Sequence, residues 1–273
     1  MLIDTHAHVN FNAFKKDADE VIRRSLDNGV WMINVGSQYS TSARAVEMAE
    51  RYEKGVYAAV GIHPIHLSEG IFKTKIDQEE IEFKTREERF VKDDYRKLAS
   101  SKKVVAIGEI GLDYWYRPKT EKKMNEMKDL QRQTLMEQIA LAKELNLPVI
   151  FHCRAAHDEM ISILENERGL RGVLHCFTGT WAEAQKYLEM GFYIGFNGII
   201  FKFNAEETIK NIPLERMVLE TDCPYLTPPQ EAGKRNEPIY VKHVAEKIAG
   251  IRNLSYEEII NITTKNAKEL FGI

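Results

Sequence analysis

Two histidines separated by one residue lie near the start of the chain, in the stretch Leu2-Ile3-Asp4-Thr5-His6-Ala7-His8. The apolar beginning of this stretch predicts a short β-strand, in which side chains two positions apart point to the same side. His6 and His8 should therefore project together, and a pair of imidazoles can hold a divalent metal ion. The alternative is a pair of hydrogen-bonded histidines without a metal, and the pair alone leaves both interpretations open.

Four further side chains of metal-binding type end other apolar runs: Glu109, His152, His175 and Asp222. Four histidines and two carboxylates exceed the four ligands of one tetrahedral zinc ion, but they suit two cations about 3.5–4 Å apart. Such a pair needs a bridging carboxylate to offset the repulsion between the cations, and we expect Glu109 in that catalytic role. Asp222 is expected to bind one cation and to accept a proton from a bridging water.

Apolar runs alternate with helical patterns along the chain, which predicts a parallel sheet. The expected strands are residues 2–8, 30–35, 56–61, 104–109, 148–152, 172–175, 192–196 and 217–221. The main expected helices are 13–28, 40–52, 121–146, one after residue 152 that reaches to about 168, 180–190, 238–249 and 255–271. Eight strands predict a (β/α)8 TIM-like barrel, in which the carboxyl ends of the strands meet at one mouth. The alternative, a doubly wound open sheet, usually has a glycine-rich loop after its first strand, where this chain has His6 and His8.

Residues 67–100 do not follow this alternation and are dense in Lys, Glu, Asp and Arg. The region is longer than the usual connection between a strand and a helix. Residues from Asp77 onward could form a helix with a charged, solvated face. We expect residues 1–273 to be a single metallo-hydrolase barrel domain that carries this charged insertion.

The composition is that of an ordinary globular protein, with 44% hydrophobic and 29% charged residues. The net charge of −3 provides no broad basic field for nucleic acid, so such a ligand would be held locally, at the mouth. No apolar run reaches about 18 residues and no targeting segment is evident, so we expect a cytoplasmic protein with no membrane segment. The three cysteines each follow a predicted ligand, and we expect them to be buried on the opposite face of their strands: Cys153, Cys176 and Cys223.

Several stretches, in this order, resemble the TatD family of metal-dependent deoxyribonucleases, within the amidohydrolase-like barrels. They are Ile3-Asp4-Thr5-His6-Ala7-His8, Gly61-Ile62-His63-Pro64, Gly108-Glu109-Ile110-Gly111-Leu112-Asp113-Tyr114, Leu174-His175-Cys176-Phe177-Thr178-Gly179, Glu220-Thr221-Asp222-Cys223-Pro224-Tyr225-Leu226 and Gly233-Lys234-Arg235-Asn236-Glu237-Pro238. The resemblance covers essentially the whole chain and implies a TIM-like barrel, two divalent cations and hydrolysis of DNA phosphodiesters. By the family pattern, one cation is held by His6, His8, Glu109 and Asp222, and the other by Glu109, His152 and His175. The mixed nitrogen and oxygen ligands admit Zn²⁺, Mn²⁺ or Mg²⁺.

Two features depart from the family pattern, and neither is a ligand. The region of residues 67–100 is longer than is usual in the family. The residue after Arg154 is often acidic in the family, whereas this chain has Ala155. Both departures bear on how the substrate fits.

Five further residues are candidate substrate contacts: His63, Arg154, Lys234, Arg235 and Tyr114. Arg154 could pair with a phosphate through two hydrogen bonds, and Lys234 and Arg235 lie in a loop that should border the mouth. Tyr114, with Trp115 and Tyr116 after it, could offer a ring for stacking on a base. Each also has an ordinary structural explanation, as a turn-ordering histidine, a solvated charge or a packed aromatic ring.

The expected function is hydrolysis of DNA phosphodiesters by a two-metal-activated water, as a 3′–5′ exonuclease on single strands or strand ends. One rival is a two-metal hydrolase of a small ester, amide or lactone, because a fold does not settle a function. The other rival is a non-catalytic metal-dependent binding protein. Protein partners stay open.

Overall fold

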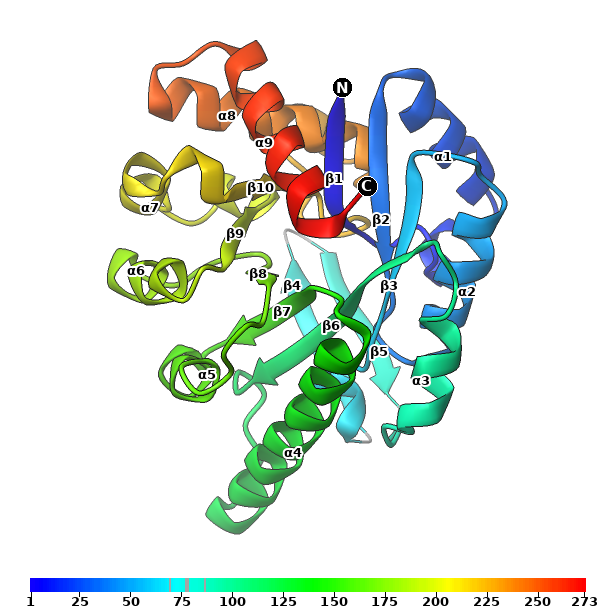
Figure 1. Cartoon of the computed structure of the whole chain (residues 1–273), viewed down its shortest axis with the longest axis vertical. Helices are drawn as coiled ribbons and strands as arrows, with labels where there is room; N and C mark the ends of the chain where they lie inside the picture. Colours follow the sequence, from blue (N-terminus) through cyan, green and yellow to red (C-terminus); the bar gives the residue numbers. More distant parts are fainter. Residues whose placement is uncertain (69, 77–78, 86) are drawn as a thin grey trace.

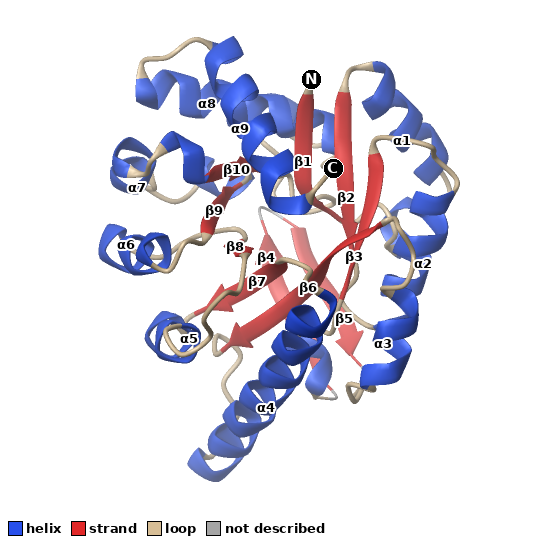
Figure 2. Cartoon of the chain, viewed as in Figure 1, coloured by secondary structure: helices blue, strands red, loops and turns tan. Residues whose placement is uncertain are grey.

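Eight parallel strands form one sheet that curves into a nearly closed barrel in the computed structural model of the chain, which describes residues 1–68, 70–76, 79–85 and 87–273 (Figures 1 and 2). Neighbouring strands pair in the order β1-β2-β3-β6-β7-β8-β9-β10. The strands are β1 (Leu2–Ala7), β2 (Val30–Val35), β3 (Val56–Val60), β6 (Val104–Asp113), β7 (Val149–Arg154), β8 (Gly172–Leu174), β9 (Tyr193–Phe196) and β10 (Met217–Leu219). The predicted (β/α)8 TIM-like barrel is confirmed.

Helices surround the strands as an outer ring (Figure 2). They are α1 (Ala18–Asp27), α2 (Tyr39–Glu50), α3 (Lys92–Leu98), α4 (Glu121–Leu145), α5 (His157–Leu164), α6 (Trp181–Glu189), α7 (Glu206–Asn211), α8 (Val241–Arg252) and α9 (Tyr256–Phe271). Short 3-10 helices cover Asn12–Phe14, Pro64–Leu67, Gly198–Phe201, Leu214–Arg216, Pro229–Glu231 and Pro238–Tyr240. Several helices differ from the prediction: α1 begins later than residue 13, α5 ends before residue 168, α8 begins and ends later than 238–249, and α7 was not predicted.

Two apolar clusters fill the space inside and outside the barrel. The larger one lies between the sheet and the helices, and its members include Phe14, Tyr95 and Tyr187. The smaller one contains a residue from each of the eight strands, together with Leu270 and Phe271 from the last turn of α9. The barrel interior is therefore a packed core that α9 caps, so a substrate can approach only from the mouth.

The barrel closes between β1 and the segment that follows β10. The backbone nitrogen of Asp222 donates to the carbonyl oxygen of His6 over 2.8 Å, and that of His8 donates to the carbonyl oxygen of Cys223 over 2.9 Å. The buried carboxylate of Asp4 accepts hydrogen bonds from the backbone nitrogen and the hydroxyl of Thr221, at 2.9 and 2.5 Å. These contacts fix the last predicted metal ligand beside the first one.

Strand β6 does not end at Glu109, as the sequence predicted, but continues to Asp113. Its second half pairs with β7 up to the match of Asp113 with Arg154. All ten residues of β6 are buried; its first half pairs with β3 and the part from Ile107 onward pairs with β7. Glu109 therefore lies in the middle of a strand, and a second carboxylate stands at its end.

The charged insertion contains a two-stranded antiparallel sheet, formed by β4 (Gly70–Ile76) and β5 (Glu79–Thr85). The prediction of a helix from Asp77 onward is wrong over residues 79–85. Residues in this stretch alternate in polarity, as in Ile81 and Phe83, which is the period of a strand. Asp77 itself lies outside the described residues, and a helix begins only at Lys92.

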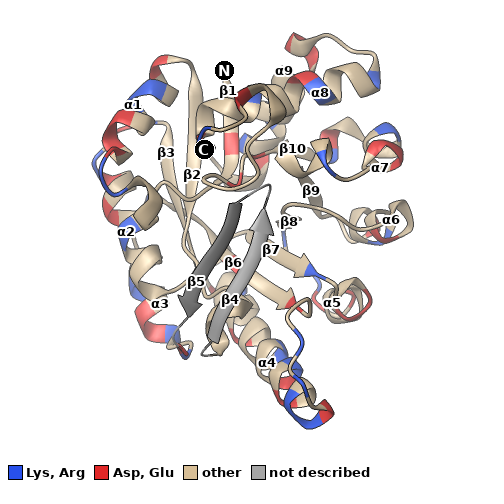
Figure 3. Ribbon diagram, turned by 180° about the vertical axis from the view of Figure 1, so that it is seen from behind, with Lys and Arg blue, Asp and Glu red and all other residues tan. Residues whose placement is uncertain are grey.

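Among the described residues, no helix has both the length and the apolar composition needed to cross a lipid bilayer. Acidic and basic residues are interspersed along the outer helices in the view of Figure 3. The expectation that a charged ligand is held locally stays a prediction. The expected cytoplasmic location stays a prediction.

Candidate metal centre

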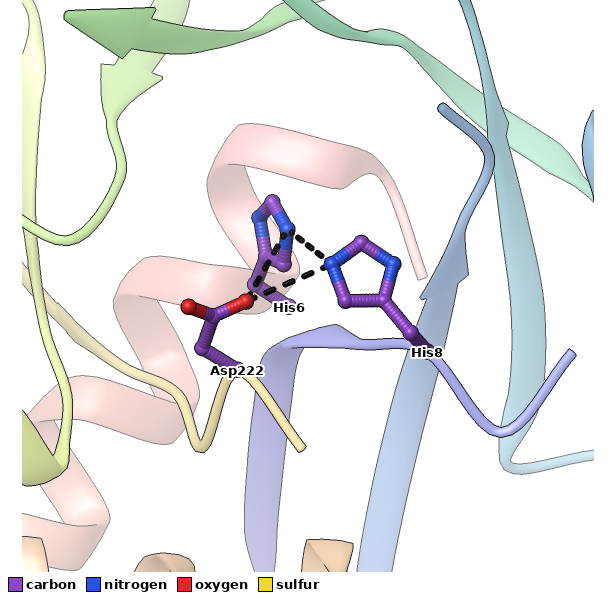
Figure 4. Close-up of side chains that lie close together, drawn as sticks. All are labelled: His6, His8 and Asp222. Carbon is purple, nitrogen blue, oxygen red and sulfur yellow. Dashed lines mark hydrogen bonds and ion pairs between the residues drawn. The ribbon is translucent and has the colours of Figure 1, made fainter. Parts of the chain in front are cut away.

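Three ligand atoms predicted for the first cation come together where the barrel closes. Nε2 of His6 lies 3.1 Å from Nε2 of His8, and Oδ1 of Asp222 lies 3.8 and 3.3 Å from these two nitrogens (Figure 4). Oε2 of Glu109 completes the group, at 3.4 Å from His6 and 3.9 Å from His8. We call these four side chains the first ligand group.

A second ligand group forms around the other oxygen of Glu109. Oε1 of Glu109 lies 2.9 Å from Nδ1 of His152 and 2.8 Å from Nε2 of His175, and these two nitrogens are 3.4 Å apart. The carboxylate of Glu109 is therefore divided between the two groups, one oxygen to each. This division is the geometry that a bridging carboxylate requires.

The hydrogen bonds of His8 determine what its other ring nitrogen can do. Nδ1 of His8 lies 2.8 Å from the carbonyl oxygen of Val35, which can only accept, so Nδ1 must carry the proton. In the neutral ring Nε2 then presents a lone pair, and it faces carboxylate oxygens of Asp222 and Glu109. Lone pairs that face one another are unfavourable unless a cation lies between them.

In the second ligand group, too, the outer ring nitrogens of the histidines face groups that accept hydrogen bonds. Nε2 of His152 lies 3.2 Å from Oδ2 of Asp113, and Nδ1 of His175 lies 3.4 Å from Oε1 of Glu220. Protons on these outer nitrogens leave Nδ1 of His152 and Nε2 of His175 as lone pairs directed at Glu109. A carboxylate behind a metal-binding histidine fixes its tautomer and raises its basicity.

The charges of the two groups are strongly coupled. Burial disfavours the charge on Glu109, but His63, His175 and His6 outweigh burial and hold the pKa of this carboxyl well below its usual range. Burial likewise opposes ionisation of Asp222, but the hydrogen bond with His8 and the charges of the neighbouring histidines lower the pKa of this carboxyl. Both carboxylates are therefore ionised at neutral pH, as metal ligands must be.

These observations show that the residues present fit divalent cations. Each group offers imidazole nitrogens and carboxylate oxygens, a mixture that suits zinc, manganese or iron, and magnesium at the more carboxylate-rich group. The groups of described residues whose ligand atoms lie close enough to hold an ion include His6, His8 and Asp222 as one set and Glu109, His152 and His175 as another. The assignment of the six residues as ligands stays a prediction. The short distances between their ligand atoms are those that such an assignment requires.

His63 lies at the edge of the second ligand group, and its role differs from that of the ligands. Its Nδ1 accepts a hydrogen bond of 3.0 Å from the backbone nitrogen of Ile65, so Nε2 carries the proton. That Nε2 faces Oε1 of Glu109 at 3.4 Å. Burial, aided by His152, lowers the pKa of His63 to about 3, so the ring is neutral. His63 therefore presents an N–H donor to the centre rather than a lone pair.

The three basic residues predicted to meet phosphate have different surroundings. Lys234 is exposed, and its Nζ lies 2.7 Å from Glu231. Arg235 is paired with Asp17 at 2.6 Å and with Glu237 at 3.3 Å. The guanidinium of Arg154, in contrast, is matched with no carboxylate among the described residues, and its carbon lies 4.7 Å from the centre of the Trp115 ring.

The predicted stacking of Tyr114 on a base is not supported by its position. Its ring is 4% exposed and belongs to the core between the sheet and the helices, because residue 114 follows β6 on its outward side. Lys128 covers the ring at 4.6 Å from its centre. The next residue, Trp115, is 60% exposed and is the aromatic ring available to a ligand.

Two of the three cysteines are buried as predicted, namely Cys153 and Cys223, whereas Cys176 is half-buried. Burial raises the pKa of Cys153 to about 12, so its thiol stays protonated. Sγ of Cys176 lies 3.6 Å from Oδ1 of Asn197. No cysteine belongs to the ligand-like groups found among the described residues.

Two carboxylates at the centre were missed from the sequence, Asp113 and Glu220. The signal for Asp113 was its spacing from Glu109, because residues an even number of positions apart on a strand share a face. Glu220 accepts hydrogen bonds from the backbone nitrogen of Cys176 and from Nδ2 of Asn197, at 2.7 and 2.9 Å. These contacts join segments far apart in the sequence, so no local sequence pattern predicts them.

Comparison with known proteins gives consistent matches over the whole chain. A family model described as TatD related DNase matches residues 3–272. The chain is 42% identical over 279 residues to YabD of Bacillus subtilis, an uncharacterized metal-dependent hydrolase, with 100% of both chains covered. It is 32% identical over 283 residues to the 3′-5′ ssDNA/RNA exonuclease TatD of Pantoea ananatis, again with 100% of both covered. Among solved structures, YJJV, a TatD homolog from Escherichia coli, gives a TM-score of 0.83 at 28% identity, over 100% of this chain and 98% of that one.

Proposed function

Because the chain belongs to the TatD-related DNase family and is a metal-dependent hydrolase of ester bonds, we propose that it cleaves DNA phosphodiesters as a 3′–5′ exonuclease on single strands. The observation that carries the proposal is the division of the Glu109 carboxylate between two ligand groups. Two divalent cations held there would polarise the phosphoryl group and make water a stronger nucleophile at neutral pH. The relative from Pantoea ananatis, named for this exonuclease activity, supports the choice of substrate.

Asp222 is the residue that can accept the proton of the attacking water. One of its oxygens faces His8, and Figure 4 shows that the other points away from the two histidines. Its lowered pKa keeps the carboxylate ionised and able to take a proton at neutral pH. General-base catalysis of this kind contributes typically about 10²–10⁴-fold to a rate.

Two neutral or cationic donors at the mouth can orient the phosphate. His63 offers its Nε2–H beside Glu109, and Arg154 offers a guanidinium that no described carboxylate neutralises. At Lys234 and Arg235 a phosphate would compete with the carboxylates that already pair with them, Glu231 and Asp17. Few phosphate contacts imply a shallow dependence of affinity on salt concentration, because the slope scales with the number of phosphates neutralised.

Cleavage of end-labelled DNA tests the proposal directly. A single strand labelled at its 5′ end should give a ladder of progressively shorter products, and the same strand labelled at its 3′ end should release the label first as a mononucleotide. Blunt duplex should be cut more slowly, and closed circular DNA should stay intact. Efficient cutting of closed circles would exclude the exonuclease.

A small-substrate panel separates the proposal from its main rival. The metal-loaded enzyme is offered esters, amides and lactones beside the oligonucleotides, with Glu109→Ala as the inactive control. Turnover of a small ester with failure on every DNA would establish the rival hydrolase. Failure of the metal-loaded enzyme on all substrates, with both ligand groups filled, would favour the non-catalytic binding protein.

A further inference from the structure

We propose that Trp115 and Arg154 form a subsite for one unpaired nucleotide, whose base stacks on the Trp115 ring and whose phosphate pairs with Arg154. The inference rests on the proposed cleavage of single strands and adds the residues that grip the strand beside the metal centre. It assigns base stacking to Trp115 in place of Tyr114.

Arg154 projects into the mouth on the same side as a predicted metal ligand. Along β7, His152 and Arg154 are two positions apart and share a face, whereas Cys153 between them is buried in the outer core. Two residues of a strand span about 6.6 Å. Arg154 therefore leaves β7 one step further toward the mouth than the predicted ligand His152.

The charge of Arg154 is not neutralised within the described part of the protein. Its contacts there are aromatic: the guanidinium carbon lies 4.7 Å from the centre of the Trp115 ring and 5.6 Å from that of Tyr116. Stacking on aromatic faces leaves the edges of a guanidinium, and hence its N–H donors, free to meet a phosphate bidentately. The charges of Lys234 and Arg235, in contrast, are partly neutralised by neighbouring carboxylates, Glu231 and Asp17.

The ring of Trp115 is exposed, whereas its backbone is anchored. Its ring is 60% exposed, yet its backbone nitrogen donates a 3.0 Å hydrogen bond to Oδ1 of Asp113. The backbone of Asp113 is held in turn by the buried side chain of Gln131. The Gln131 amide accepts a hydrogen bond from the backbone nitrogen of Asp113 at 2.8 Å and donates one to the backbone oxygen of Asp113 at 3.1 Å. The backbone nitrogen of Tyr114 donates to the carbonyl oxygen of Arg154 over 2.9 Å, so the two halves of the subsite are joined.

One side chain connects this subsite to the metal centre. While Oδ1 of Asp113 fixes Trp115, Oδ2 of the same carboxylate faces Nε2 of the predicted ligand His152 at 3.2 Å. The backbone that carries the Trp115 ring is therefore tied to the second ligand group through one carboxylate. A base stacked on Trp115 must be unpaired and splayed from its neighbours, because in a duplex both of its faces are covered. The subsite thereby accounts for a preference for single strands.

The test pairs a protein change with a substrate change. Wild type, Trp115→Ala and Trp115→Phe are compared on a single-stranded oligonucleotide and on oligonucleotides that lack one base, at each of the first four positions from the 3′ end. We expect Trp115→Ala to raise KM for the intact strand about tenfold, and Trp115→Phe to recover most of this loss, as stacking on an aromatic ring predicts. One abasic position should raise KM of wild type by a similar factor and leave KM of Trp115→Ala unchanged.

Matched controls separate the subsite from general damage. Trp31, which lies near the start of β2 under Lys268 of α9, gives the control variant Trp31→Phe, and its KM should equal that of wild type at every substrate. Arg154→Lys should raise KM for intact and abasic strands alike, because it alters the phosphate contact and not the base contact. Metal content and melting temperature of each variant are measured alongside.

Two results would overturn the inference. If every abasic position penalises wild type and Trp115→Ala by the same factor, no base stacks on Trp115. If Trp115→Phe is as poor as Trp115→Ala while the melting temperature of both is unchanged, the ring is not the contact. Either result leaves cleavage of single strands by the wild type intact, whereas a wild type that cleaves no oligonucleotide would overturn the proposed function and this inference together.

Discussion

Oε1 of Glu109 lies 2.8 Å from Nε2 of His175, and Oε2 of the same carboxylate faces Nε2 of His6 at 3.4 Å. His175 has a pKa raised well above its usual value, because Glu109 and Glu220 outweigh the opposing effect of burial. In the metal-free protein a proton on His175 therefore partly offsets the negative charge of Glu109, as a cation would. Binding of a cation must displace that proton, so metal affinity should fall as the pH is lowered.

Removal of Glu109 should empty more than one metal site. Wild type is expected to hold about two equivalents of divalent metal per chain, and Glu109→Ala well below one, because each group loses an oxygen ligand and the bridge between cations is gone. Metal analysis after gel filtration measures this, with Glu207→Gln on the surface of α7 as the control. A Glu109→Ala protein with full metal content and normal activity would refute the bridging role.

Asp222→Asn should separate metal binding from proton transfer. The amide keeps the shape of the carboxylate and can still offer an oxygen ligand, but it cannot accept the proton of the attacking water. We expect a rate loss of roughly 10²-fold or more with most of the metal retained. Single-turnover rates at saturating metal measure the effect. A nearly unchanged rate at full metal content would reduce Asp222 to a ligand.

Asp113→Asn should damage the centre more than the small change in size suggests. The new amide can present its nitrogen to Nε2 of His152, which would force the proton onto Nδ1 and remove the lone pair aimed at the second cation. Loss of such a supporting carboxylate typically lowers metal affinity about 10–100-fold. Metal titration followed by calorimetry measures it, with Asp94→Asn in α3 as a surface control. Unchanged affinity would show that Asp113 does not set the tautomer.

Arg235→Ala should lower the stability of the fold, because Arg235 joins the loop after β10 to the start of α1. Its guanidinium donates to the carbonyl oxygen of Ala13, pairs with Asp17 and lies 4.0 Å from the centre of the Phe14 ring. We expect a loss of about 1 kcal/mol in the free energy of unfolding. Lys234→Ala, at an exposed side chain, should leave it nearly unchanged. Urea unfolding followed by circular dichroism measures both.

The pH dependence of this loss checks its origin. The hydrogen bond with Arg235 lowers the pKa of Asp17 below its usual 3.8. A carboxyl with a lowered pKa stabilises the fold above its unfolded-state pKa, and this contribution is lost as the pH falls through the lower, folded-state value. The difference between wild type and Arg235→Ala should therefore shrink below about pH 3.8. A difference that stays constant down to pH 2 would assign it to the contacts of Arg235 with the Ala13 carbonyl oxygen and the Phe14 ring.

The sequence by itself determined the repeating strands and helices and the types of the six ligand residues. Apolar runs broken at regular intervals encode strands locally, and α4 agrees with its predicted range to within one residue because its pattern spans many turns. His6 and His8 were paired correctly because their spacing on one strand is a local property. The same local rule pointed to the barrel through the number of strands.

The tertiary structure alone decided which atoms face one another. Asp222 reaches His6 only because the segment after β10 hydrogen-bonds to β1, and Glu109 reaches His175 only because β6, β7 and β8 are neighbours in register. Contacts between segments that are distant in the chain also decide the tautomers of the histidines. They likewise decide that the guanidinium of Arg235 pairs with a carboxylate, whereas that of Arg154 lies against an aromatic ring. Sequence periodicity fixes the direction of a side chain within its own element, but distances between elements arise from packing and strand register, which no single segment encodes.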